Sequence, residues 1–158
     1  MHSSARRFFE DVAKRWPPSG AVLEAGSYNV NGGIRDLFAG CEYTGVDCRS
    51  GPGVDVVADC HDLPFYVEVF DWVVSTSMIE HDPKPWLSVA EMRRVLRRGG
   101  LLVLAAPGFG WPRHNEPIDC YRFTVDAFRG LLDGMDILHL DELNDGDGPD
   151  VRAVARKL

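Results

Sequence analysis

The sequence predicts an α/β fold: a doubly wound, seven-stranded, mostly parallel sheet with the last strand antiparallel. Short apolar runs alternate along the chain with segments of helical periodicity. Runs such as 21–25 and 100–107 are apolar almost throughout, which is typical of parallel strands covered on both faces. The last two runs are joined only by the turn-rich loop "NDGDGPD", which favours an antiparallel pair.

The seven runs define where strands are expected. We expect strands at residues 21–25, 43–47, 54–59, 70–76, 100–107, 136–143 and 151–157. The connections "CRSGPG" and "CHDLPFYVEV", after the second and third runs, leave little room for helices. The predicted domain is therefore compact, with shortened crossovers.

Three segments have the spacing of amphipathic helices. The first, 3–16, has Ser3 or Ser4 as its expected N-cap and ends at a proline pair, while Thr124 is the expected N-cap of the third. The second lies in "KPWLSVAEMRRVLRRGG" and is expected to stop at the glycine pair. The predicted apolar faces are Phe8, Phe9, Val12 and Trp16 in the first helix, and Trp86, Val89, Met92 and Leu96 in the second.

Length and composition favour a single domain over residues 1–158, with no membrane segment. The N-terminus lacks the apolar centre of a signal peptide, so we expect a cytoplasmic protein with reduced cysteines. The formal net charge of −7, without a long basic block, makes nucleic acid a disfavoured partner. The oligomeric state is left open by the sequence.

The stretch "VLEAGSYNVNGG", residues 22–33, indicates a ligand site. Its strand ends at Glu24, and ligands of open α/β sheets bind beyond the carboxyl ends of strands. Gly26 permits a tight turn and a close approach of a ligand to the backbone. Asp47 and Asp59 end the next two predicted strands, and no cluster of lysines or arginines accompanies them. These features favour a ligand with a ribose and a positive charge but no phosphate.

Five motifs in this order resemble class I S-adenosylmethionine-dependent methyltransferases, most closely the type 11 branch. They are "VLEAGSYNVNG", "YTGVD", "VVADCHDLPF", "FDWVVSTSMIEH" and "EMRRVLRRGGLLVLAAP", and the tail "RHNEPIDCYRFTVDAFRGLL" also resembles that branch. The glycine loop departs from the usual E/D-x-G-x-G-x-G, because Tyr28 and Val30 occupy the later glycine positions. Gly32 follows two residues further on.

The resemblance implies S-adenosyl-L-methionine as cofactor and assigns residues to its parts. Asp47 would bind the ribose hydroxyls and Asp59 would face the adenine amino group. The residues implied to border the methionine end are Glu24, Gly26, Ser27 and Gly32. The backbone of Cys60 and the side chain of His61 would lie beside the adenine ring, and the backbone carbonyls of Ser75 and Thr76 would meet the cofactor's amino group.

Two further segments are candidates for the acceptor side. His81, after the fourth strand, could accept a proton from a nucleophile; alternatively, Glu80-His81 organises its loop through hydrogen bonds. The loop 107–124 is too long for a simple connector, and we expect it to form a substrate wall. Its candidate substrate residues are Trp111, His114, Glu116, Tyr121 and Arg122. His114, Glu116 and Asp119 lack a specific metal-ligand spacing, so no metal is expected.

The resulting hypothesis is methyl transfer to an unidentified small-molecule acceptor. Such a displacement needs positioning and exclusion of water more than a dedicated catalytic group. One alternative is a non-catalytic methyltransferase-like binding module, which the short crossovers favour. A second is a dinucleotide-binding oxidoreductase of the NAD type, although that class would require G-x-G-x-x-G after the first strand.

Overall fold

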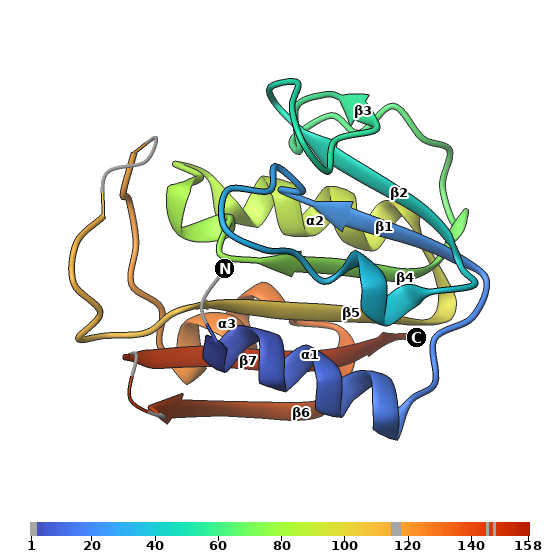
Figure 1. Ribbon diagram of the computed structural model, residues 1–158. Helices are drawn as coiled ribbons and strands as arrows, with labels where there is room; N and C mark the ends of the chain where they lie inside the picture. Colours follow the sequence, from blue (N-terminus) through green and yellow to red (C-terminus); the bar gives the residue numbers. More distant parts are fainter. Residues whose placement is uncertain (1–2, 115–117, 145, 147) are drawn as a thin grey trace.

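The computed structural model describes residues 3–114, 118–144, 146 and 148–158, and it contains one seven-stranded sheet. The strand order is β3-β2-β1-β4-β5-β7-β6, and β7 (Pro149–Lys157) runs antiparallel to both neighbours. Figure 1 shows the sheet as a stack of arrows with β3 and β6 at its edges. The predicted doubly wound, mostly parallel sheet with its last strand reversed is confirmed.

The remaining elements follow the predicted order. The other strands are β1 (Ala21–Ala25), β2 (Glu42–Asp47), β3 (Val56–Val57), β4 (Phe70–Thr76), β5 (Leu96–Pro107) and β6 (Met135–Asn144). The helices are α1 (Ser3–Arg15), α2 (Pro85–Val95) and α3 (Val125–Leu131), with 3₁₀ turns η1 (Arg35–Phe38) and η2 (Ile79–His81).

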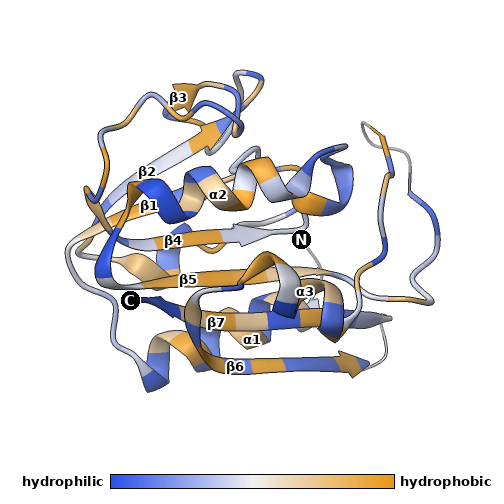
Figure 2. Cartoon of the chain, turned by 180° about the vertical axis from the view of Figure 1, so that it is seen from behind, coloured by the Kyte–Doolittle hydropathy of each residue, from blue (hydrophilic) through white to orange (hydrophobic). Residues whose placement is uncertain are grey.

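Helices cover both faces of the sheet. Helix α1 lies on one face (Figure 1), and α2 and α3 lie on the other, which faces the viewer in Figure 2. Phe8, Phe9 and Val12 of α1 pack with one set of strand residues, whereas Met92 of α2 and Phe128 of α3 pack with the opposite set. The sheet therefore separates two apolar layers, as its nearly continuous apolar runs predict.

The shortened crossovers are also confirmed. No helix connects β2 to β3 or β3 to β4, and all residues of these two connections are described. In the connection from β1 to β2, the helical part is limited to the four residues of η1. None of the helices in the described part of the chain is long and apolar enough to cross a membrane. Strand order reverses between β1 and β4, so the chain leaves these adjacent strands in opposite directions and opens a crevice at their carboxyl ends.

Three local predictions are wrong. Helix α2 ends at Val95 rather than at the glycine pair, because Leu96 already pairs with Phe70 as the first residue of β5. Trp86 lies in the first turn of α2 and is 54% exposed, so it is not part of the apolar face. Ser3 and Ser4 are both inside α1 rather than at its N-cap, and the buried Ser4 hydroxyl donates a hydrogen bond to Asp150 of β7.

Candidate functional site

A cavity of about 480 Å³ lies at the carboxyl ends of β1, β2 and β4. Its wall includes the whole loop Gly26–Gly33 and the residues that follow the three strands. Of the residues predicted for the site, the lining set contains Glu24, Gly26, Ser27, Gly32, Asp47, Asp59, Cys60, His61, Thr76, His81 and His114. The structure thus brings residues from six separate segments of the sequence to one place.

The backbone of the first loop is fixed by neighbouring strands. Gly26 has φ of +81°, and a Cβ there would lie 2.3 Å from the Met78 side chain, so only glycine fits. The N–H groups of Gly26 and Ser27 both donate to the Val46 carbonyl, at 2.8 and 3.0 Å. Further along, Asn29 Oδ1 accepts a hydrogen bond from Gly32 N at 2.7 Å and closes a turn. This turn replaces the missing later glycines of the loop.

Glu24 is the deepest carboxylate in the cavity and is only 7% exposed. Burial is the main cause that raises its pKa to about 7, and a hydrogen bond from the Tyr43 hydroxyl at 2.8 Å opposes the shift. Glu24 is therefore only partly ionised near neutral pH. A cation bound beside it would favour the ionised form.

Asp47 ends β2 at the edge of the cavity and is half-buried. Its carboxylate accepts hydrogen bonds from the backbone N–H groups of Tyr28 and Arg49, both at 3.3 Å. These long contacts fix the direction of the side chain and leave it capacity for a further donor, such as a ligand hydroxyl.

His61 connects two carboxylates across the cavity. Its Nε2 lies 2.8 Å from Asp82 Oδ1, and its Nδ1 lies 3.6 Å from Asp59 Oδ1. Asp82 is buried and also accepts hydrogen bonds from Ser88 Oγ at 2.6 Å and Lys84 N at 2.7 Å. Asp82 was missed in the sequence, where the only signal was an acidic residue directly before a proline.

The chemistry of the cavity fits a cationic nucleoside. Its lining includes four carboxylates (Glu24, Asp47, Asp59 and Asp82) against the one arginine, Arg49. Two buried hydroxyl oxygens at its wall, Ser27 Oγ and Thr76 Oγ1, have no hydrogen-bond partner among the described residues. Buried polar atoms normally have partners, so these two are available to a ligand.

Ser75 does not belong to this wall. Its side chain is buried in the sheet, where Oγ donates to the Ala25 carbonyl at 2.8 Å. The alternation of side chains along β4 directs Thr76 to the cavity and Ser75 away from it. The predicted contacts of the cofactor's amino group are with the backbone carbonyls of Ser75 and Thr76, and they stay a prediction. Among the side chains, Thr76 lines the cavity, followed by Ser77 and Met78.

The loop after β5 contributes His114 to the cavity, but three of its predicted substrate residues lie elsewhere. Trp111 donates its indole N–H to Asp150 at 3.1 Å, and the Tyr121 hydroxyl donates to the Pro83 carbonyl at 3.0 Å. Arg122 forms a two-pronged pair with Asp119, at 2.5 and 2.7 Å. These side chains fasten the loop instead of lining the cavity. Glu116 lies outside the described residues.

Arg122 makes most of the side-chain hydrogen bonds that hold this loop. Besides Asp119, it donates to the backbone carbonyls of Trp111 at 3.2 Å and Pro112 at 2.8 Å. The guanidinium group of Arg122 is the main cause that lowers the pKa of Asp119 to about 2. A planar guanidinium suits such a site because its donors point in several fixed directions.

His81 is held by the same loop. Its Nδ1 contacts the Ile118 carbonyl, and the backbone carbonyl of Glu80 accepts from Cys120 N at 2.8 Å and Tyr121 N at 3.1 Å. The alternative role for Glu80-His81, organising the loop through hydrogen bonds, agrees with these contacts. A role for His81 as a general base stays a prediction.

Comparison with known proteins identifies the domain. A methyltransferase domain family model matches residues 31–104. An uncharacterized methyltransferase of Mycobacterium marinum is 47% identical over 55 residues, or 35% of this chain and 22% of the relative. The chain thus spans about a fifth of the length of that curated relative.

Solved structures share the whole fold at low sequence identity. An S-adenosylmethionine-dependent methyltransferase from Methanosarcina mazei has a TM-score of 0.74 at 18% identity, covering 93% of this chain and 97% of its own. The 1,6-didemethyltoxoflavin-N1-methyltransferase of Burkholderia thailandensis, solved with its substrate and S-adenosylhomocysteine, has a TM-score of 0.79 at 17% identity, covering 98% and 78%. Over residues 31–104 the chain thus matches the methyltransferase domain family model, and its fold is that of S-adenosylmethionine-dependent methyltransferases.

Proposed function

We propose that the chain transfers a methyl group from S-adenosylmethionine to a small-molecule acceptor. The observation that carries the proposal is the cavity itself, in which four carboxylates and two unpartnered hydroxyls surround a space of about 480 Å³ at the strand-order reversal. A sulfonium and an ammonium group match that negative charge, and a ribose matches Asp47. A dinucleotide would place its negatively charged pyrophosphate next to these carboxylates, and the like charges would repel each other.

Different parts of the cavity would hold different parts of the cofactor. Glu24 and the hydroxyl of Thr76 would hold the methionine end, and Asp47 would accept hydrogen bonds from the ribose diol. Asp59, Cys60 and His61 would border the adenine, with the Asp82 carboxylate keeping His61 in place. These assignments follow the family resemblance and the lining of the cavity.

The reaction asks little of the protein beyond placement. The cofactor supplies an electrophilic methyl group on a positively charged sulfur, and the sulfur leaves as a neutral thioether. The protein must align the acceptor, exclude water and, for a hydroxyl or protonated amine, provide for the departing proton. His81 and His114, both in the cavity wall, are the proposed groups on the acceptor side.

A small-molecule acceptor is supported by the volume of the cavity, about 480 Å³. Away from the first loop its lining includes His81 of η2, Ser88 of α2 and His114 of the loop after β5. The Burkholderia thailandensis neighbour was solved with 1,6-didemethyltoxoflavin bound, which makes small heterocycles a reasonable first group of acceptors.

The test has a binding step and a turnover step. Calorimetry should give a micromolar dissociation constant for S-adenosylhomocysteine and no saturable heat for NAD⁺; the reverse would identify the oxidoreductase alternative. Incubation with methyl-labelled S-adenosylmethionine and a panel of small oxygen, nitrogen and sulfur nucleophiles should then give labelled product. Tight cofactor binding with no product from any acceptor would favour a non-catalytic binding module.

A further inference from the structure

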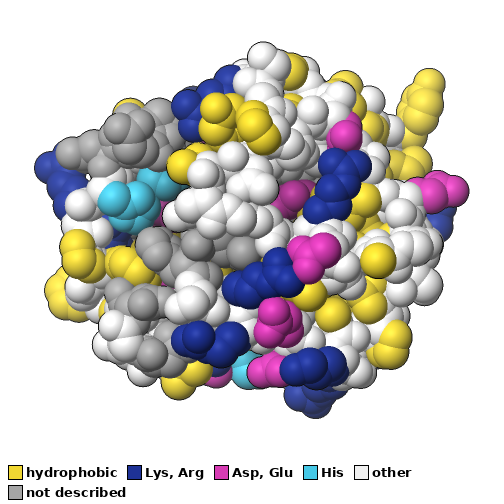
Figure 3. Space-filling view, in the orientation of Figure 1, with side chains coloured by type: hydrophobic (Ala, Val, Ile, Leu, Met, Phe, Trp, Pro, Cys, Tyr) yellow, Lys and Arg dark blue, Asp and Glu magenta, His cyan; other side chains and the backbone are white. Residues whose placement is uncertain are grey.

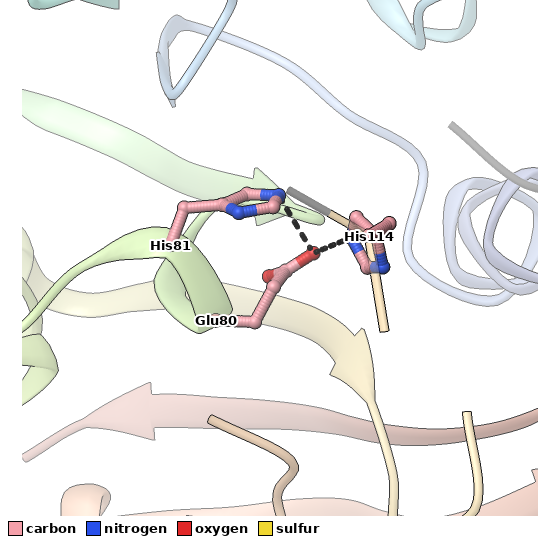
Figure 4. A group of neighbouring side chains, drawn as sticks. All are labelled: Glu80, His81 and His114. Atoms are coloured by element: carbon pink, nitrogen blue, oxygen red, sulfur yellow. Dashed lines mark ion pairs between the residues drawn. The ribbon is translucent and has the colours of Figure 1, made fainter. Parts of the chain in front are cut away.

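Three side chains meet at the acceptor end of the cavity. Glu80 and His81 come from η2, directly after β4, and His114 comes from the loop after β5. Figure 4 shows both imidazoles turned toward the Glu80 carboxylate. Glu80 Oε1 lies 3.6 Å from His81 Nε2 and 3.8 Å from His114 Nε2, and one ligand atom of each residue lies within 4.8 Å of the other two.

Glu80 is a buried carboxylate that lacks, among the described residues, the hydrogen-bond partners that such a group usually has. The residue is 0% exposed, and neither carboxylate oxygen accepts a hydrogen bond from any described residue. A buried carboxylate without donors is costly, and such groups are normally paired or bound to metal. The Nε2 atoms of His81 and His114 lie 3.6 and 3.8 Å from Glu80 Oε1, which is too far for hydrogen bonds.

The tautomer of His81 adds a second unfavourable contact to Glu80. Nδ1 contacts the Ile118 carbonyl, which can only accept, so Nδ1 carries a hydrogen. In the neutral imidazole, Nε2 then presents a lone pair toward Glu80 Oε1, which is also an acceptor. Two facing lone pairs repel each other unless a cation lies between them or the ring is protonated.

We propose that Glu80, His81 and His114 form a binding site for one divalent transition-metal ion of the zinc class. Two imidazoles and one carboxylate are a recurrent ligand set for such ions, with further positions left open. Ligand atoms about 2 Å from a tetrahedral Zn²⁺ lie roughly 3.3 Å apart, so a small contraction of the observed triangle would suffice. The Ile118 carbonyl on His81 Nδ1 matches the outer hydrogen bond that metal-binding histidines usually make.

The site is accessible to an ion from solvent. The His81 side chain is 15% exposed and that of His114 is 34% exposed, and both line the cavity, whereas Glu80 is buried next to them. Figure 3 shows histidine side chains together at the surface on the side where the loop after β5 projects in Figure 1. An open coordination position would therefore face the cavity, where an oxygen or sulfur of the acceptor could occupy it.

A proton is the competing explanation for the cluster. The Glu80 carboxylate raises the pKa of His114, so an imidazolium at this position could neutralise the carboxylate and fasten the loop without any metal. The two explanations predict different results for direct metal binding.

The experiment measures metal binding on the full chain, freed of any purification tag and dialysed against a chelator. Zn²⁺ titration followed by calorimetry should give one ion per chain, and Co²⁺ should give the visible absorption bands of a four- or five-coordinate site. Glu80→Gln and His114→Ala should each weaken Zn²⁺ binding at least tenfold, as loss of a ligand predicts. His139→Gln is the matched control, because His139 lies on β6, and it should leave the affinity unchanged.

Melting curves establish that each variant is folded. Because His114 is a partly exposed loop residue, the His114→Ala variant should fold even if Glu80→Gln does not, and the test then rests on His114→Ala. Absence of stoichiometric binding at about 1 mM Zn²⁺, or affinity unchanged in the folded variants, would overturn the metal site in favour of the proton. Binding of S-adenosylhomocysteine is measured on the same samples without metal. Intact cofactor binding would leave the proposed function standing whatever the metal result.

Discussion

The two loops that border the cavity are held in different ways. The loop Gly26–Gly33 is held through its own backbone N–H groups: those of Gly26 and Ser27 donate to the Val46 carbonyl, and that of Gly32 donates to the Asn29 side chain. The loop after β5 is held in addition by one charged side chain, because the Arg122 guanidinium donates to Asp119 and to three carbonyls.

This difference has a functional meaning. A backbone-held loop keeps its shape under most side-chain changes, which suits the binding of an invariant cofactor. In a loop held by one arginine, the other residues can be substituted without loss of the arginine contacts, which suits the recognition of different acceptors. The contrast predicts where substitutions damage folding and where they damage binding.

The largest expected effect is on the side-chain-held loop. Arg122→Ala removes the partner of a nearly buried carboxylate and should lower the free energy of unfolding by about 3 kcal/mol. The measurement is urea unfolding followed by fluorescence. Arg98→Ala, which changes a mostly exposed arginine, is the control and should cost less than about 0.5 kcal/mol. Equal stability of the two variants would show that Arg122 does not fasten the loop.

On the cofactor side, the expected stability effect depends on pH. The pKa of Glu24 is about 7 in the folded chain against 4.5 ordinarily, so folding favours its protonated form. The resulting stability is fully present below pH 4.5 and is lost as pH rises through 7, a change of about 3 kcal/mol. Glu24→Gln cannot ionise, and its stability should exceed that of the parent increasingly between pH 5 and pH 8. Parallel pH profiles of parent and variant would contradict the raised pKa.

Asp47→Ala should weaken binding of S-adenosylhomocysteine by about 1–3 kcal/mol, because a ribose diol would lose its charged acceptor. The fold should survive, since Asp47 is half-buried at a strand end and accepts two long backbone hydrogen bonds and one weak hydrogen bond from the Cys48 thiol. Calorimetry on the folded variant is the measurement. An unchanged dissociation constant would reduce Asp47 to a structural strand end.

His114→Ala is the complementary change on the acceptor side, and it should have the smallest effect on cofactor binding. Turnover should fall or the acceptor KM should rise, while the dissociation constant for S-adenosylhomocysteine stays within a factor of about three, or roughly 0.7 kcal/mol. Steady-state kinetics and calorimetry on one preparation provide both values. If cofactor binding fails and acceptor use does not, the loop after β5 belongs to the cofactor side.

The sequence predicts those features that depend on local pattern. All seven strands overlap the predicted runs, although β3 contains only Val56 and Val57 and β5 begins four residues early, at Leu96. Thr124 Oγ1 caps α3 by accepting from Ala127 N at 3.1 Å. The end of α2 was misplaced because Leu96 follows the helical spacing, and only pairing with Phe70 recruits it into β5.

The site was predictable on the cofactor side, where strand ends fix the carboxylates, and less so on the acceptor side. Trp111, Tyr121 and Arg122 have the chemistry of substrate contacts, yet their partners are Asp150, Asp119 and backbone carbonyls, brought near by folding. Glu80 shows the same limit, because a glutamate in "MIEH" gives no sign that tertiary packing removes it from water.

The two margins of the sheet resist unwanted strand pairing by different means. At one margin β3 consists of Val56 and Val57 alone, so it exposes few free backbone groups that another chain could use as a template. At the other margin β6 is ten residues long, but it carries Asp136, Asp141 and Glu142. Asp141 and Asp136 lie near Arg152 and Arg156 of β7, so an added strand would meet charged side chains along β6. The short β3 and the charged β6 therefore both disfavour edge-to-edge pairing in a domain with few covering helices.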